Sequence, residues 1–242
     1  MRVFELVIFA VALLSGATAS LVGFGIGSLL TPLIAMRVGT PVAVALVTLP
    51  HAVATALRCW RLRRHIDRGV LARFGLLSAA GALSGAIVYT RLGPGALTVA
   101  LGCLLLLTSA AQLSGWTSRW QPQGVAVAVF GVVSGFFGGV AGNQGGLRSA
   151  AMLAFGLPPL TFVATATATG LVVDAARTPV YLWYAGPAVL SHWPVVAIAS
   201  AGVVLGTLAG ERLLFGLSRR RFGQFIGVAI GILGLALVFT AG

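Results

Sequence analysis

The chain has 242 residues, of which 58% are hydrophobic and only 8% are charged. Soluble domains carry about 25% charged residues, so this composition excludes an ordinary globular protein, and the high hydrophobicity also excludes a disordered chain. What remains is a polytopic membrane protein, which we expect to be all-α and embedded in a lipid bilayer.

The net charge of +12 comes from arginine alone, because the chain contains no lysine. Arginine clusters beside apolar segments mark cytoplasmic loops, so we interpret this charge as a topology signal and expect no nucleic-acid partner. The first cluster, at 58–73, is assigned to one loop, and the second lies at 212–221. The clustered residues are Arg58, Arg61, Arg63, Arg64, Arg68, Arg73, Arg212, Arg219, Arg220 and Arg221.

Apolar segments long enough to cross a bilayer, which takes about 20 residues, follow one another along the whole chain. They are predicted at 3–22, 41–58, 70–90, 95–113, 124–141, 159–184, 187–210 and 222–241, with an uncharged loop at 184–187. Two further apolar pieces, 28–36 and 147–155, are too short to span. Each of the two short pieces follows a glycine-rich break.

These breaks predict an internal repeat. A shift of 119 residues places Ser15-Gly16 on Ser134-Gly135, Gly23 on Gly142 and Gly27 on Gly146. We therefore predict two homologous transmembrane halves, 1–115 and 124–242, joined by a polar linker at 116–123. Repeats of this kind are typical of secondary transporters.

The positions of the arginine clusters predict how the two halves are related. The basic loop follows the second main segment in the first half and the third in the second half. Eight simple spans would place these loops on opposite sides of the membrane. Both loops face the cytoplasm if each glycine-broken segment is a hairpin that enters and leaves on one side. Each half then crosses three times, and we predict inverted-topology repeats.

The breaks are also the first candidate sites, because non-helical backbone at membrane depth is tolerated only inside protein or around a wet cavity. A short helix after each break would point free N–H groups and a positive dipole end at it, which suits an anion. The alternative is that these glycines only permit tight helix crossings. Unpaired amides in an apolar segment favour the site. The candidates are Gly23, Gly25, Gly27, Asn143, Gln144, Gly145 and Gly146.

Charged residues inside the spans extend this candidate site. Arg148 lies one turn into the second short helix, and Asp174 and Arg177 share one face of the 159–184 segment at i and i+3. Two arginines against one aspartate leave one positive charge, which a bound oxyanion would neutralise. The alternative is a structural pair of Asp174 with Arg177, with Arg148 extending to an interface.

His51 is a further candidate, for coupling to protons together with Asp174. The alternative is that it merely caps a kink at Pro50. Two cysteines, Cys59 and Cys103, give neither a disulfide framework nor a metal-binding spacing, so we expect no metal, cofactor or catalytic residue.

The sequence resembles the TauE/SafE family of sulfite and organosulfur-anion exporters. The likeness lies in the stretch from Ser15-Gly16 to Gly23-Phe-Gly-Ile-Gly27, followed by Thr31-Pro32-Leu33, and in the stretch 131–149, which contains Gly142-Asn-Gln-Gly-Gly-Leu-Arg-Ser149. The resemblance implies a bacterial-type inner-membrane transporter of small sulfur-containing or related organic anions. Ile26 and Ser28 interrupt the glycines that are more usual in the first stretch.

We therefore expect a secondary transporter that exports sulfite or organosulfonates by alternating access. The anion would bind Asn143, Gln144 and Arg148, with the glycines of the first break forming the opposite wall. The alternatives are an integral-membrane enzyme, disfavoured by the lack of a catalytic motif, and a non-transporting membrane subunit. A homodimer is one expectation for the assembly.

Overall fold

The computed structural model describes residues 2–114, 124–213 and 219–240. The predicted linker at 116–123 lies outside the described residues. The first half contains α1 (Arg2–Val22), α2 (Ile26–Val38), α3 (Thr40–Leu62), η1 (Arg63–His65), α4 (Arg68–Val70), the π-helical turn η2 (Leu71–Gly75), α5 (Leu76–Tyr89) and α6 (Pro94–Ser114). The second half contains α7 (Val125–Ala141), α8 (Gly145–Met152), the 3-10 turn η4 (Leu153–Phe155), α9 (Pro159–Ser191), α10 (Trp193–Leu213) and α11 (Arg219–Thr240).

The predicted fold class is confirmed. The described residues are almost entirely helical and include seven helices that are long and apolar enough to cross a membrane. The two short pieces after the glycine breaks form α2 and α8. The chain is therefore an all-α polytopic membrane protein.

The predicted loop at 184–187 is wrong, because α9 continues through Pro187 and ends at Ser191. A proline removes only one backbone donor, and membrane helices tolerate it where the freed carbonyl finds another partner. The chain turns instead at His192, whose backbone N–H contacts the carbonyl oxygens of Ala188 and Val189. The turn still contains no arginine, so the predicted charge pattern is unaffected.

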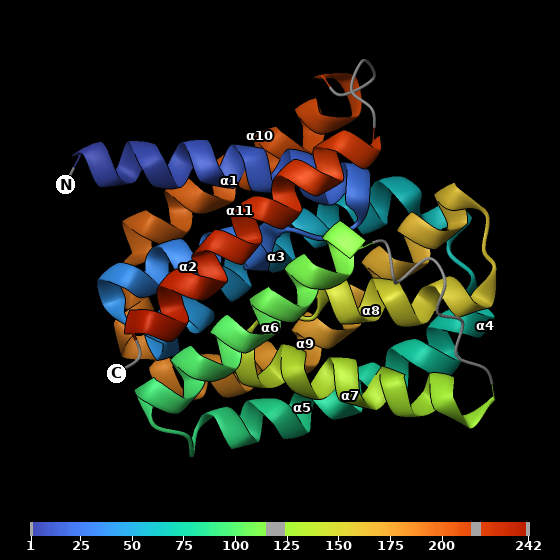
Figure 1. Cartoon of the computed structure of the whole chain (residues 1–242), viewed down its shortest axis with the longest axis horizontal. Helices are drawn as coiled ribbons and strands as arrows, with labels where there is room; N and C mark the ends of the chain where they lie inside the picture. Colours follow the sequence, from blue (N-terminus) through green and yellow to red (C-terminus); the bar gives the residue numbers. More distant parts are fainter. Residues whose placement is uncertain (1, 115–123, 214–218, 241–242) are drawn as a thin grey trace.

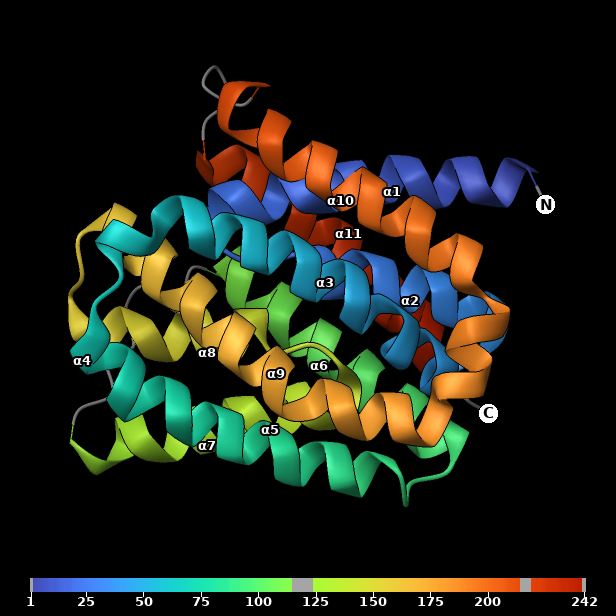
Figure 2. The same cartoon turned by 180° about the vertical axis from the view of Figure 1, so that it is seen from behind.

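Equivalent helices of the two halves run in opposite directions (Figures 1 and 2). Helix α3 starts at the end of the bundle where the N-terminus lies, whereas α9 starts at the far end and runs back. The pair α1 and α2 enters and leaves at the N-terminal end, and the pair α7 and α8 enters and leaves at the other. Helix α4 lies at the same end as the end of α10 and the start of α11. These directions support the inverted repeats, which stay a prediction.

The two halves pack through one another. The most extensive helix pairings are α1 with α10 and α5 with α7, followed by α6 with α11 and α3 with α9. Glycines permit the first two crossings, since a Cβ on Gly210 would lie 2.7 Å from Ala17 Cα and one on Gly135 would lie 2.9 Å from Ser78 Cα. Small residues that allow this close approach are typical of membrane helix interfaces. Gly135 and Gly210 therefore serve to let two helices cross closely.

Candidate functional site

The two glycine-rich breaks meet in the centre of the bundle. A Cβ on Gly27 would lie 3.0 Å from the carbonyl oxygen of Gly142, so a side chain there would press directly against the second break. The Ser28 hydroxyl donates to Asn143 Oδ1 across 3.1 Å. The start of α2 therefore lies against the start of α8, as expected for two broken helices that share one site. Their first N–H groups lack partners within the helices.

A small central cavity lies between the two breaks. Its volume is about 10 Å³, roughly what one water molecule needs. The lining residues are Phe24, Gly25, Gly27, His51, Gly142, Asn143, Gln144, Gly145, Arg148 and Arg177. The fold thus brings together residues that are more than 150 positions apart in the sequence.

Three of the candidate residues, Gly23, Gly146 and Asp174, do not line this cavity. Gly23 ends α1, and its carbonyl oxygen accepts a hydrogen bond of 3.3 Å from Arg148 Nη2. Gly146 faces away from the cavity, because a Cβ there would lie 2.6 Å from Thr108 Cγ2. Gly23 therefore contacts the site through its carbonyl group, and Gly146 is assigned to a neighbouring cavity.

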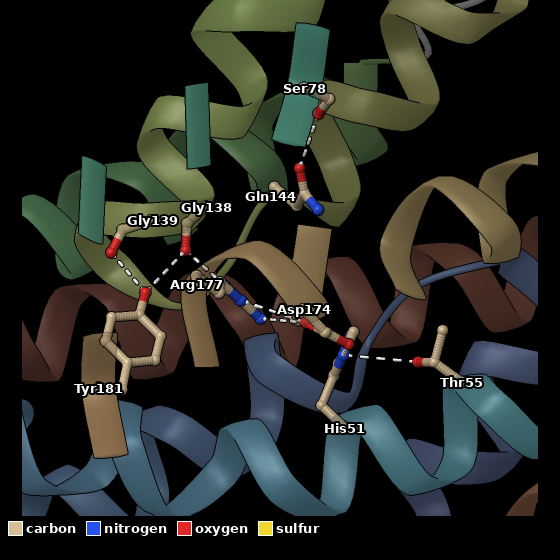
Figure 3. A network of polar contacts seen from close by, with 9 residues as sticks. All are labelled: His51, Thr55, Ser78, Gly138, Gly139, Gln144, Asp174, Arg177 and Tyr181. Carbon is tan, nitrogen blue, oxygen red and sulfur yellow. Dashed lines mark hydrogen bonds and ion pairs between the residues drawn. The ribbon is translucent and has the colours of Figure 1, made fainter. Parts of the chain in front are cut away.

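Asp174 is the centre of a polar network beside the cavity (Figure 3). Its Oδ2 lies 2.6 Å from His51 Nδ1, and its Oδ1 accepts from Arg177 Nη2 at 2.9 Å and from Nε at 3.2 Å. His51 Nδ1 also lies 3.4 Å from the Thr55 hydroxyl. Asp174 is 1% exposed, whereas His51 is 18% exposed, so the histidine is the more accessible member of this pair.

Arg177 has a second partner at the end of α7. Its Nη1 donates to the carbonyl oxygen of Gly138, and the Tyr181 hydroxyl donates to the carbonyl oxygens of Gly138 and Gly139. The last carbonyl groups of a helix lack partners within it, and arginine at this end also interacts favourably with the helix dipole. Arg177 therefore closes the end of α7 and pairs with Asp174 at the same time.

Arg148 is paired far less completely. Its side chain is 2% exposed, and its Nη2 contacts the Gly23 carbonyl oxygen, but Nε and Nη1 have no hydrogen-bond partner among the described residues. Because Asp174 is already paired with Arg177, the unbalanced positive charge of the site belongs to Arg148.

The two amides of the second break also leave donors unused. Gln144 Oε1 accepts from the Ser78 hydroxyl at 3.3 Å, and Asn143 Oδ1 accepts from Ser28. Both amide nitrogens, Asn143 Nδ2 and Gln144 Nε2, are buried and unpartnered within the described part of the chain. Buried polar groups are almost always hydrogen-bonded, so a cluster of unused donors indicates a ligand that only accepts.

Sequence reasoning missed Ser28, Ser78 and Tyr181. Tyr181 follows Asp174 and Arg177 at helical spacing, and this face of α9 was a usable signal. Ser78 carried none, because a serine in a membrane helix usually bonds to its own backbone.

The interpretation of Arg58 as a loop arginine is wrong. The residue lies inside α3, is 3% exposed, and its Nε donates to the Thr167 hydroxyl at 3.0 Å. Helix α3 extends past the predicted end at residue 58 and ends at Leu62. Arg58 can be buried in it because the apolar stem of an arginine packs within a bundle while the guanidinium group binds a polar partner.

Comparison with known protein families shows which family the chain belongs to. The model described as "Sulfite exporter TauE/SafE" matches residues 8–237, which is nearly the whole chain. The chain belongs to the TauE/SafE family of sulfite exporters. TauE/SafE proteins are membrane transporters and not enzymes, so the chain is a multi-pass membrane protein of a kind that bacteria typically place in the inner membrane. Comparisons with curated proteins and with solved structures found no match.

Proposed function

We propose that the chain exports sulfite or a small organosulfonate by alternating access, and that the anion binds where the two glycine breaks meet. Family membership supports an anion as the transported species. The observation that carries the choice of site is the set of buried, unpartnered donors on Asn143, Gln144 and Arg148. All three side chains line the same cavity.

The chemistry of these donors fits a sulfite or sulfonate head group. Such a head group has three oxygen atoms that accept hydrogen bonds, and two neutral amides with one guanidinium offer it donors from three side chains. The charges agree as well, because Arg177 is balanced by Asp174 and Arg148 adds one uncompensated positive charge. A singly charged anion would balance the charge of Arg148.

The size of the cavity supports a mechanism with more than one conformation. A space of about 10 Å³ holds one water molecule but not a sulfite ion, so the described conformation is closed. Substrate then enters and leaves only after the elements around the breaks separate. The hairpin of α1 and α2 opens toward one end of the bundle and the hairpin of α7 and α8 toward the other (Figure 1). Each hairpin would therefore move to open the site toward its own side of the membrane. This is the arrangement that inverted-repeat transporters use for alternating access.

The test is transport by the purified protein in liposomes. We expect labelled sulfite or a short sulfonate to cross at a rate clearly above that of protein-free liposomes. We also expect the same anions, but not choline, to raise the melting temperature of the detergent-purified protein. If the protein neither transports these anions nor is stabilised by them at millimolar concentration, the proposal is overturned. That result would favour a non-transporting membrane subunit.

A further inference from the structure

A second cavity lies next to the central one and shares one wall with it. Its volume is about 170 Å³, far larger than that of the central cavity. It is lined by Phe24, Thr108, Ala111, Gln112, Gly146, Ser149, Ala150, Leu153 and Phe162. Phe24 is the residue that lines both cavities, and consecutive residues of α8 line one or the other, so Phe24 and the start of α8 lie between them.

The lining and position of this second cavity suit the passage of an anion. Three of its lining residues, Thr108, Gln112 and Ser149, are polar, and the buried Ser149 hydroxyl has no partner among the described residues. The cavity lies among α6, α8 and the start of α9. These segments lie toward the end of the bundle that carries α4 (Figure 1). This end also carries the arginine-rich segment at 61–73.

Phe24 lies in the break between α1 and α2, outside both helices. It lies between Gly23 and Gly25, whose φ angles are +89° and +137°. Both angles fall where side chains other than glycine are strained, so this stretch depends on glycine and is not held in a helix. The ring is 8% exposed and packs against Gly145, where a Cβ would lie 3.0 Å from Phe24 Cγ. Any larger residue at 145 would collide with it.

We propose that Phe24 is the gate between the anion site and a vestibule formed by the second cavity, and that the anion passes through this vestibule at the arginine-rich end. This inference rests on the proposed function and adds the path and its closing residue. Rotation of the ring toward the vestibule would join the two cavities, while the closed ring separates the buried donors of Asn143, Gln144 and Arg148 from water.

The first experiment measures access to the site with a thiol probe. In a chain with Cys59→Ala and Cys103→Ala, Gln144→Cys places one thiol in the central cavity. We expect a small anionic methanethiosulfonate to label it about tenfold or more faster when Phe24→Ala is added, because a closed conformation that opens rarely protects the site. Phe137→Ala, which removes a partly exposed ring from α7, is the control. Equal labelling rates with and without Phe24 would overturn the gate.

The second experiment fills the vestibule and leaves Phe24 in place. Ala111 lines the vestibule, while its neighbour Ala110 is exposed on the outer face of α6. We expect Ala111→Trp to reduce sulfite flux at least about tenfold while sulfite still stabilises the protein against heat, and Ala110→Trp to transport normally. Normal flux in Ala111→Trp would overturn the vestibule but leave the proposed function intact. Absence of both transport and thermal stabilisation by sulfite and short sulfonates in the unmodified chain would instead remove the proposed function.

Discussion

Among single residues, the buried arginines of the site differ in how completely they are paired. Arg177 contacts Asp174 through two nitrogens and the end of α7 through the third. Arg148 has one long contact to Gly23 and two unpartnered nitrogens. A buried charge without partners is costly unless a ligand completes its shell. The difference favours structural support as the function of Arg177, and it is the reason why the proposed function places anion binding at Arg148.

The first prediction concerns Arg148. Arg148→Ala should weaken anion binding about 10- to 100-fold, since hydrogen bonds to a charged group contribute about 1.5–3 kcal/mol. Arg148→Lys keeps the charge but loses the planar fork, so it should restore binding only in part. Titration calorimetry with sulfite measures the change, and Arg91→Ala, at an exposed arginine outside the site, is the control. Unchanged affinity in Arg148→Ala would remove this residue from the site.

The second prediction concerns Asp174. Asp174→Asn leaves Arg177 and His51 without their negative partner, and breaking a buried ion pair costs about 3–5 kcal/mol. We expect a clearly lower melting temperature, followed by intrinsic tryptophan fluorescence in detergent. Asp67→Asn is the matched control, because the Asp67 side chain caps α4 and asparagine caps a helix equally well. Equal melting temperatures for the two variants would show that the network does not stabilise the fold.

The sequence pointed to the charged and amide side chains of the candidate site but not to the hydroxyl groups that contact them. Arg148 and Asp174 could be predicted because a charge deep in an apolar segment is costly and therefore informative. Ser78 could not be predicted, because a hydroxyl costs little in a helix and its partner on Gln144 is set by the α5–α7 crossing. Arg58 was misassigned for a related reason, since its position beside five other arginines concealed its burial.

Among the helices, glycine has two different functions. In α10 and α7, residues such as Gly210 and Gly135 allow a neighbouring helix to approach closely. In the breaks, Gly23, Gly25 and Gly142 have positive φ angles and end or begin a helix inside the bundle. The sequence interpretation treated these as alternatives for the break glycines, whereas in the structure both occur, on different glycines.

A third prediction follows from a glycine of α9. A Cβ on Gly170 would lie 2.7 Å from Arg148 Nη1, so Gly170→Ala should displace the guanidinium without changing any charge. We expect weaker sulfite binding, about tenfold or more, with a fold that remains intact. The matched control is Gly186→Ala in the same helix, where a Cβ would have no atom within 4 Å. Equal affinities of the two variants, from the same calorimetric titration, would contradict this placement of Arg148.

Helix boundaries were predictable where a break or charge marks them, and less so elsewhere. The starts of α2 and α8 follow glycines, and both were expected within a few residues. The end of α9 was not predicted correctly. A proline usually marks a helix boundary in water-soluble proteins, but Pro187 lies inside α9.

Across the whole molecule, α4, the end of α10 and the start of α11 lie at the same end of the bundle. Helix α3 reaches this end before α4, and α10 ends there before α11 begins (Figure 2). The turns between α5 and α6 and between α9 and α10 lie at the opposite end. The arrangement agrees with the swapped charge pattern of the two halves and with cytoplasmic arginine clusters.

The fourth prediction is the membrane topology. In a chain without native cysteines, Ile66→Cys and Arg220→Cys should both react with an impermeant thiol reagent applied from the cytoplasmic side. Arg91→Cys and His192→Cys should react from the opposite side only. These outcomes follow from the common end of α4 and α11 and the far position of the two turns. Labelling of residues 66 and 220 from different sides would refute the inverted arrangement.

The crossing of helices between the halves has a consequence for how the protein can be divided. Each half forms its largest contacts with the other, α1 with α10 and α7 with α5. Neither half encloses a core by itself, so a fragment of either half expressed alone would expose faces that now touch protein. Co-expressed fragments can restore every one of these contacts without the covalent connection.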